Sequence, residues 1–377
     1  MNDREIQKLP ASLGDKLFKK GKLNKFAKYV EATLDGHGYS KSSFYVCVYD
    51  NNRFFLKIYP HIINEVVELK KNVSKKIYST EAETEIAVLQ ILKKKFIDKN
   101  ITPCIIELIY MKTRSKILND LPSERVCSKY MQTEEQTHTH ESNIENKLCK
   151  YRESIKNKTT KDKISFLVLE KCQIEYLQYL RLNVDSPISF SVNKSILFML
   201  LHCYYCIKQI YPSFKHGDLH LYNIMILIDK NYIYDPPNIK YLVFDVDGED
   251  YAVPYFGIIP KFIDFGFSNI PEENIYSPVS LNIRRKSEFI QHDILNLFYF
   301  IYNYREIINL YSLLELLQAL EPNGLYTTSK FYINKMLHLA PSAEDMIKNK
   351  IWDSYRNFTP PPESIYKRYS PLESINK

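Results

Sequence analysis

Residues 216–223 read HGDLHLYN, and they place the carboxylate of Asp218 and the carboxamide of Asn223 in one short loop after a long apolar segment. In a surface loop, Asp and Asn are most often turn-forming residues, so this stretch alone is only moderately specific. Residues 261–266 then read KFIDFG, an apolar strand that ends at the carboxylate of Asp264. Together the two stretches place two carboxylates and one carboxamide at the ends of apolar segments.

The order of the two stretches resembles that of the protein kinases, whose catalytic loop, H-R-D-x-x-x-x-N, precedes a D-F-G triplet. The resemblance implies that Asp218 is the catalytic base for the substrate hydroxyl, and that Asn223 and Asp264 are metal ligands. It also implies ATP and Mg²⁺ as cofactors. Because phosphoryl transfer develops dense negative charge on the phosphate oxygens, a lone carboxylate would not suffice and the chemistry needs both motifs.

Upstream of these motifs, Gly36 and Gly38 look like the first half of the kinase glycine-rich loop, whose backbone amides cover the phosphates of ATP. Lys41 stands at the third glycine position, and an ordinary turn explains the two glycines equally well. Lys57 follows within FFLKI, residues 54–58, a strand on which kinases keep the lysine that contacts the α- and β-phosphates. The alternative for Lys57 is a plain charge on an edge strand.

A helix is predicted over Ser79–Phe96, because apolar residues recur at helical spacing after a Ser-Thr cap and an acidic first turn. Kinases pair the strand lysine with a glutamate on this helix, and the resemblance assigns that role to Glu85. Glu81, one turn earlier on the same face, is the alternative register.

Residues 166–172, FLVLEKC, resemble the strand that enters the hinge between the kinase lobes, so backbone groups from Glu170 to Cys172 would bind adenine. A plain buried strand explains the same residues. Further along the chain, Asp293 resembles the aspartate that anchors the backbone of the kinase catalytic loop.

The expected fold is α+β and bilobal, like that of the protein kinases. Residues 1–169 would hold an N-terminal extension and a lobe with an antiparallel sheet and one main helix. Residues 170–377 would hold the hinge, a mostly helical lobe and a C-terminal tail. Residues 113–163 are polar and poor in periodic apolar positions, which predicts a flexible insert. Asp247-Gly248, between two aromatic runs, predicts a hairpin.

The composition fits an ordinary soluble globule, with 45% hydrophobic and 25% charged residues among 377. A net charge of +7, spread along the chain, does not indicate nucleic-acid binding, and none is required. The longest apolar stretch, Ile196–Ile207, is too short to cross a bilayer, so no transmembrane segment is expected. Seven irregularly spaced cysteines favour reduced thiols and an intracellular, cytoplasmic location.

Three departures from the kinase pattern bear on the substrate and on regulation. Gly217 replaces the arginine of H-R-D, which makes control by a phosphorylated activation loop less expected, because that arginine is the usual partner of the phosphate. His220 stands where many protein kinases keep a lysine, and no A-P-E triplet follows D-F-G.

Two other functions stay open beside a serine/threonine-protein kinase that acts on protein substrates. HGDLH is also similar to the catalytic loop of aminoglycoside and choline-type phosphotransferases, which phosphorylate small molecules. The D-F-G form of the metal motif and the short sequence separation between it and Asp293 favour a protein substrate. A pseudokinase scaffold is the other alternative, and the joint presence of Lys57, Asp218, Asn223 and Asp264 argues against it.

The glycine-poor composition, rich in Lys, Asn, Ile and Tyr, resembles that of divergent kinases encoded by large DNA viruses. That resemblance implies serine/threonine specificity and a place in the infected-cell cytoplasm or in virus particles. The sequence names neither the substrate nor the oligomeric state.

Overall fold

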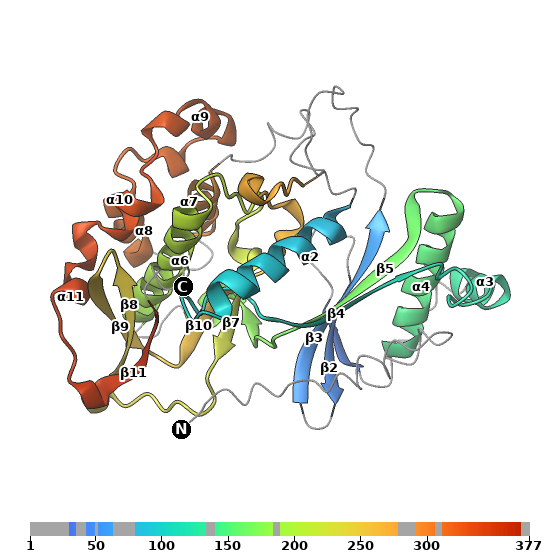
Figure 1. The fold of residues 1–377 in the computed structure, drawn as a ribbon, viewed down its shortest axis with the longest axis horizontal. Coiled ribbons are helices and arrows are strands. Elements are labelled where there is room, and N and C mark those ends of the chain that lie inside the picture. The colour runs from blue at the N-terminus through green and yellow to red at the C-terminus, as the bar shows by residue number, and fades with distance from the viewer. Residues whose placement is uncertain are drawn as a thin grey trace. The chain divides into compact units, whose positions relative to one another are not determined.

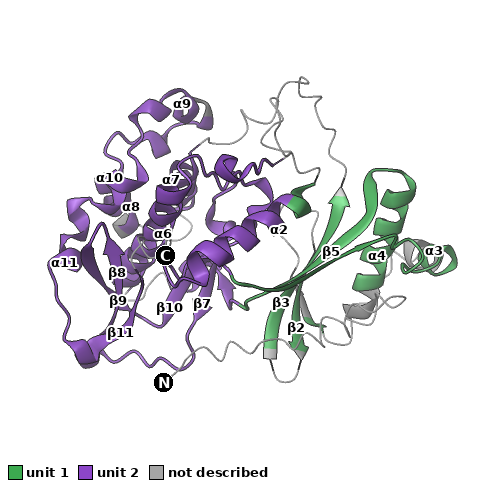
Figure 2. Cartoon of the chain, viewed as in Figure 1, with its two compact units in different colours: residues 1–66, 79–83, 107–171 green, residues 67–78, 84–106, 172–377 purple. Residues whose placement is uncertain are grey.

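The chain divides into two compact units, which Figure 2 colours separately. Unit 1 comprises residues 1–66, 79–83 and 107–171, and unit 2 comprises residues 67–78, 84–106 and 172–377. This computed structural model describes residues 30–34, 43–49, 52–62, 80–132, 140–183, 189–277, 292–305 and 311–370.

Unit 1 is built on a five-stranded antiparallel sheet of order β1-β2-β3-β5-β4 (Figure 1). Its strands are β1 (Val30–Leu34), β2 (Ser43–Tyr49), β3 (Asn52–Ile62), β4 (Leu108–Ser115) and β5 (Thr160–Leu169). Strands β2 and β3 form an antiparallel hairpin, with Val46 opposite Phe55. Side chains alternate between the two faces, so Phe54, Leu56 and Ile58 enter one core cluster and the intervening Lys57 faces the other way.

Two helices, rather than a flexible insert, fill most of the polar stretch between β4 and β5. They are α3 (Glu124–Gln132) and α4 (His140–Lys156). Ile144, Leu148 and Tyr151 recur along one face of α4 and pack against the buried face of the sheet. The insert is therefore part of the core of unit 1.

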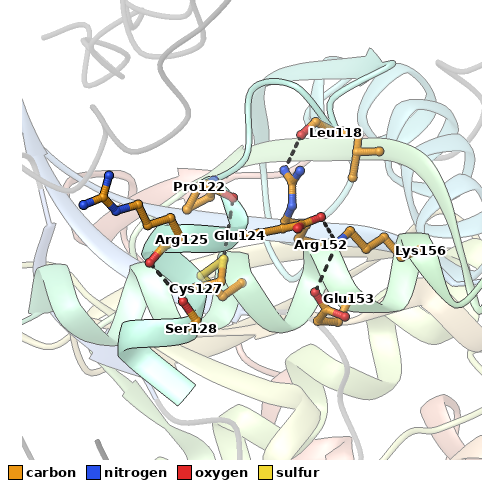
Figure 3. The surroundings of a disulfide bond; sticks show 10 residues. Leu118, Pro122, Glu124, Arg125, Cys127, Ser128, Arg152, Glu153 and Lys156 are labelled. Carbon is orange, nitrogen blue, oxygen red and sulfur yellow. Dashed lines mark hydrogen bonds and ion pairs between the residues drawn. A yellow bond between two sulfur atoms is a disulfide. The ribbon is translucent and has the colours of Figure 1, made fainter. Parts of the chain in front are cut away.

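A disulfide between Cys127 and Cys149 joins α3 to α4, with 5.3 Å between the Cα atoms, so the expectation that all seven thiols are reduced is wrong for this pair. Cys127 is 3% exposed, whereas Glu124, Arg125, Val126 and Ser128 around it on α3 are exposed. Figure 3 shows the polar contacts beside the bond: Arg152 Nη1 donates to Leu118 O at 2.8 Å, and Lys156 pairs with Glu124. Cys127 is therefore the buried residue through which this part of α3 is attached to α4.

Replacement of Cys127 by serine should lower the free energy of unfolding by about 3 kcal/mol, the usual scale for a cross-link that closes a loop of this size. Thermal unfolding with and without a reductant measures the effect. The variant should melt at one temperature under both conditions, and the reduced wild type should melt near it. Equal melting of the oxidised wild type and the variant would contradict the prediction.

Helix α2 (Glu81–Leu92) begins in unit 1 and continues into unit 2, followed by a π-helical turn, Lys93–Ile97. The predicted cap is confirmed at Thr80, whose Oγ1 accepts from Glu83 N at 3.2 Å. The hydroxyl of Thr80 also contacts Nδ1 of the buried His61 at 3.1 Å. The start of α2 is thus fixed to β3.

Unit 2 holds the remaining helices and two three-stranded sheets, of order β10-β7-β6 and β11-β8-β9 (Figure 1). Its longer helices are α6 (Ser189–Ile210), α7 (Asp293–Tyr304) and α8 (Tyr311–Leu320), and its shorter ones are α5 (Tyr176–Leu182), α9 (Lys330–Lys335), α10 (Ala343–Ile347) and α11 (Asp353–Arg356). The strands are β6 (Ile174–Glu175), β7 (Ile224–Ile228), β8 (Lys240–Val246), β9 (Glu249–Tyr255), β10 (Ile258–Phe262) and β11 (Ile365–Arg368).

Helix α6 is the central core helix of unit 2. Within the described part of the chain, it alone is long and apolar enough to cross a membrane by length and composition, and 83% of that apolar window is buried inside the protein. Burial of this kind is what a core helix of a folded domain shows.

The hairpin predicted at Asp247-Gly248 is confirmed, because β8 and β9 are joined there by two residues with φ of 53° and 84°. The C-terminal tail is more ordered than its proline-rich sequence suggests. After Pro360–Pro362 the chain forms β11, which pairs in parallel with β8.

Candidate active site

The two motif stretches lie side by side in unit 2. The catalytic-loop stretch ends in a turn at Leu221–Asn223 that leads into β7, and β10 leads into Asp264. Strands β7 and β10 pair with Phe262 opposite Ile224, and Ile263 N donates to Asn223 O at 3.1 Å. Asp264 therefore follows directly from a residue that is hydrogen-bonded to Asn223.

Asn223 orients Asp218. Its Nδ2 donates to Asp218 O at 2.8 Å and approaches Asp218 Oδ2 at 3.3 Å. Since the amide nitrogen faces Asp218, the amide oxygen Oδ1 is left as the group that a cation can bind. The Asp218 side chain is 27% exposed, so the carboxylate is both held and accessible. His220 Nε2 lies 3.4 Å from Asp218 Oδ1.

Asp293 anchors the backbone of the catalytic loop, as the sequence predicts. Its Oδ2 accepts from His216 N at 2.6 Å, and its Oδ1 accepts from Gly217 N at 2.9 Å. Tyr204 also donates its hydroxyl to Asp293 at 3.2 Å, and burial together with this carboxylate raises the pKa of Tyr204. One turn later on α7, Asn296 Nδ2 donates to Leu219 O at 2.8 Å, a contact that the sequence analysis missed. A polar residue three positions after Asp293 is the signal that could have found it.

His216 connects its own loop, residues 216–223, with the residues around the D-F-G triplet, 263–268. Its Nε2 donates to Ile263 O at 3.0 Å, and its carbonyl accepts from Ser268 Oγ at 2.9 Å. Burial lowers the pKa of His216. The carboxylates of Asp293, Asp218 and Asp264 act in the opposite direction, but burial is the larger effect. The imidazole is therefore a neutral structural link.

Gly217 occupies a position that no larger residue fits. Its φ is +83°, and a Cβ built there would lie 2.4 Å from Phe267 O. A side chain at this position would therefore collide with the backbone carbonyl of Phe267. Asp264 is also left-handed, with φ of 61°, which is uncommon for a residue with a side chain and typical of constrained functional positions.

Lys57 is buried in unit 1, with an exposed fraction of 0% and its ammonium 4.5 Å above the ring of Tyr59. Lysine is almost never buried without partners, so a plain edge charge does not describe it. Of the two candidate glutamates on α2, Glu85 is 1% exposed and Glu81 is only partly buried.

The remaining candidates are less complete. Glu170 N donates to Glu107 O at 2.9 Å within unit 1, so this amide is already used by the protein. Cys172 is fully buried, is not part of a disulfide and is the first residue of the 172–377 segment of unit 2. Gly36 and Gly38 lie outside the described residues. Within the described ranges, no three His, Cys, Asp or Glu side chains gather as a metal cluster.

Comparison with known proteins adds one relative, while no protein-family model matches the chain. A protein of Acanthamoeba polyphaga mimivirus, named "Putative serine/threonine-protein kinase R301", is 27% identical over 294 residues, which cover 72% of this chain and 70% of the relative. The similarity supports a kinase-like relationship and phosphoryl transfer in general. The fold is α+β, with a five-stranded antiparallel sheet and a helix-rich second unit, in keeping with a bilobal kinase-like fold.

Proposed function

We propose that this chain is a serine/threonine-protein kinase that transfers phosphate from ATP, with Mg²⁺, to hydroxyl groups of protein substrates. The observation that supports it most is the arrangement in unit 2, where pairing of β7 with β10 brings Asn223 beside the chain that carries Asp264, and Asn223 in turn holds Asp218.

In this proposal Asp218 is the base. The contact with the Asn223 amide fixes its carboxylate, which can accept the proton of an approaching hydroxyl. Asn223 Oδ1 and the Asp264 carboxylate would hold Mg²⁺, because hard oxygen donors suit that ion. Bound there, the ion supplies positive charge that offsets the charge developing on the phosphate oxygens.

Lys57 would contact the ATP phosphates, with Glu85 as the residue that keeps its ammonium in place. Both side chains are buried, and buried charges require a partner or a bound ligand. Gly36 and Gly38 would cover the phosphates with backbone amides, and backbone groups near Glu170 and Cys172 would bind adenine. By its resemblance to viral kinases, the protein would act in infected-cell cytoplasm or in virus particles.

A transfer assay with radiolabelled ATP and Mg²⁺ tests the proposal. The acceptors are mixed acidic and basic proteins in one set of reactions, and aminoglycosides and choline in another. The Asp218→Ala/Asp264→Ala double variant, purified in the same way, serves as the blank for contaminating kinases. We expect label on serine or threonine after acid hydrolysis, well above the blank.

The other outcomes would each replace the proposal. Label on a small molecule alone would assign the chain to the small-molecule phosphotransferases. ATP binding without transfer to any acceptor would indicate a scaffold.

A further inference from the structure

The segment after the D-F-G triplet closes on itself. Ile270 and Ile275 exchange two backbone hydrogen bonds of 3.0 Å around a 3₁₀ turn at Pro271–Glu273 and the left-handed Asn274. Ser277 ties the two ends together, because its Oγ donates to Gly266 O at 3.0 Å. Residues 265–277 therefore form a compact loop directly after Asp264, and we call them the D-F-G segment.

The D-F-G segment is attached to the chain just before the catalytic loop, at Lys215. Lys215 and Asn269 form an antiparallel bridge, with Lys215 N donating to Asn269 O at 3.1 Å and Asn269 N donating to Lys215 O at 2.8 Å. The bridge lies one residue before His216 in the catalytic loop. The bridge therefore joins the backbone before the catalytic loop to the backbone of the D-F-G segment.

Two glutamates add side-chain attachments at the turn. Glu273 Oε1 accepts from the Tyr211 hydroxyl at 2.9 Å, and Glu272 Oε1 accepts from Ser213 N at 2.7 Å. We call these four residues, Tyr211, Ser213, Glu272 and Glu273, the acidic clasp. Its donors are a neutral hydroxyl and a backbone amide, so the clasp needs no arginine.

The side of the clasp that donates to Glu273 is buried and packed. Tyr211 is 3% exposed and packs edge to face on Phe96, with 6.4 Å between ring centroids. Burial and then the Glu273 carboxylate raise the pKa of Tyr211, so its hydroxyl stays protonated as a donor. Lys208 Nζ donates to Phe214 O at 3.2 Å, in the same turn that carries Ser213.

We propose that Glu272 and Glu273 are positioning residues that hold the D-F-G segment, and with it Asp264, in the geometry for transfer without any phosphorylation of that segment. This inference rests on the proposed kinase function. A phosphate on an activation loop orders the chain by adding charge and acceptor oxygens for a nearby arginine. Here Gly217 stands at the arginine position, and the two carboxylates already supply the acceptors.

The test compares Glu272→Ala/Glu273→Ala, Tyr211→Phe and Glu273→Gln with the wild type. Each clasp bond joins a charged acceptor to a neutral donor near the surface, so we expect kcat to fall about tenfold in the double variant and less in Tyr211→Phe. Glu273→Gln keeps an acceptor oxygen and should recover most of the rate. Tyr366→Phe is the matched control, since it removes a tyrosine–carboxylate bond, to Asp229, from β11.

Two readouts separate positioning from general destabilisation. Hydrogen exchange at the amides of residues 265–277 should accelerate in the double variant, while Mg²⁺-independent nucleotide binding stays unchanged. Wild type treated with a phosphatase, which is then removed, should transfer phosphate at its full rate without a lag. A lag that disappears as the protein phosphorylates itself would overturn the inference, as would a double variant with wild-type kcat. A wild type that transfers nothing at all would sink the kinase proposal instead, and the exchange rates would still decide whether the clasp orders the segment.

Discussion

Replacement of Asp218 by asparagine should lower kcat about 10³-fold, the usual contribution of a positioned general base, with little change in nucleotide affinity. The loop should keep its shape, because Asn223 Nδ2 also donates to the Asp218 carbonyl, at 2.8 Å, and Asp293 holds the two preceding amides. Asp264→Asn should lower kcat by a similar factor and also weaken binding of ATP in the presence of Mg²⁺, because it removes a charge from the metal site.

Transfer kinetics and calorimetric titration with ATP, each with and without Mg²⁺, distinguish the two roles. Asp250→Asn is the control carboxylate, since Asp250 pairs with Arg368 on the separate β11-β8-β9 sheet and should change neither quantity. If Asp218→Asn kept the wild-type kcat, Asp218 could not be the base. Unchanged Mg²⁺ dependence in Asp264→Asn would remove Asp264 from the metal site.

The parts of the fold that the sequence predicts well are those with a local period. Strand β3 alternates between the two faces, and α2 repeats its apolar residues at helical spacing after Thr80. The end of the strand before D-F-G is likewise predictable, because the apolar run stops at the charged Asp264 and β10 ends two residues earlier, at Phe262. The motif order then suggests that Asp218 and Asp264 meet, and the pairing of β7 with β10 supplies the physical connection.

The helical insert shows where local reasoning is insufficient. Along α4 the apolar residues Ile144, Leu148 and Tyr151 do have helical spacing, but the surrounding charges hide it in any average over the segment. The Cys127–Cys149 bond depends on two helices packing together, which no spacing of cysteines reveals. Strand β11 is similar, since its parallel partner β8 lies far away in the sequence.

Gly217 is the residue whose meaning changes most between sequence and structure. As a sequence feature it is only a missing arginine. In the fold it has a positive φ and faces the carbonyl of Phe267, which comes from the D-F-G segment. The constraint is long-range and steric, so a motif comparison records the substitution without its cause.

Gly217→Ala should therefore be far more damaging than an alanine at another left-handed glycine. Gly248 is the matched control, because its φ of +84° equals that of Gly217 within a degree, yet a Cβ there meets no atom within 4 Å. Backbone strain alone should cost Gly248→Ala about 1 kcal/mol of unfolding free energy. Gly217→Ala carries the same strain plus a contact of 2.4 Å with Phe267 O, and overpacking of that kind adds about 1–3 kcal/mol.

The difference should be larger still in activity. To relieve the contact, the Phe267 carbonyl or the catalytic loop must move, and either displacement shifts Asp218 relative to Asp264. A misplacement approaching 1 Å lowers rates about 10²-fold, so we expect kcat of Gly217→Ala to fall by that order while Gly248→Ala keeps the wild-type kcat. Urea denaturation and transfer kinetics on the two variants measure both quantities. Equal losses in the two variants would mean that φ alone requires the glycine; a fully active Gly217→Ala would mean that the Phe267 carbonyl yields without disturbing the site, and the steric account of the missing arginine would fail.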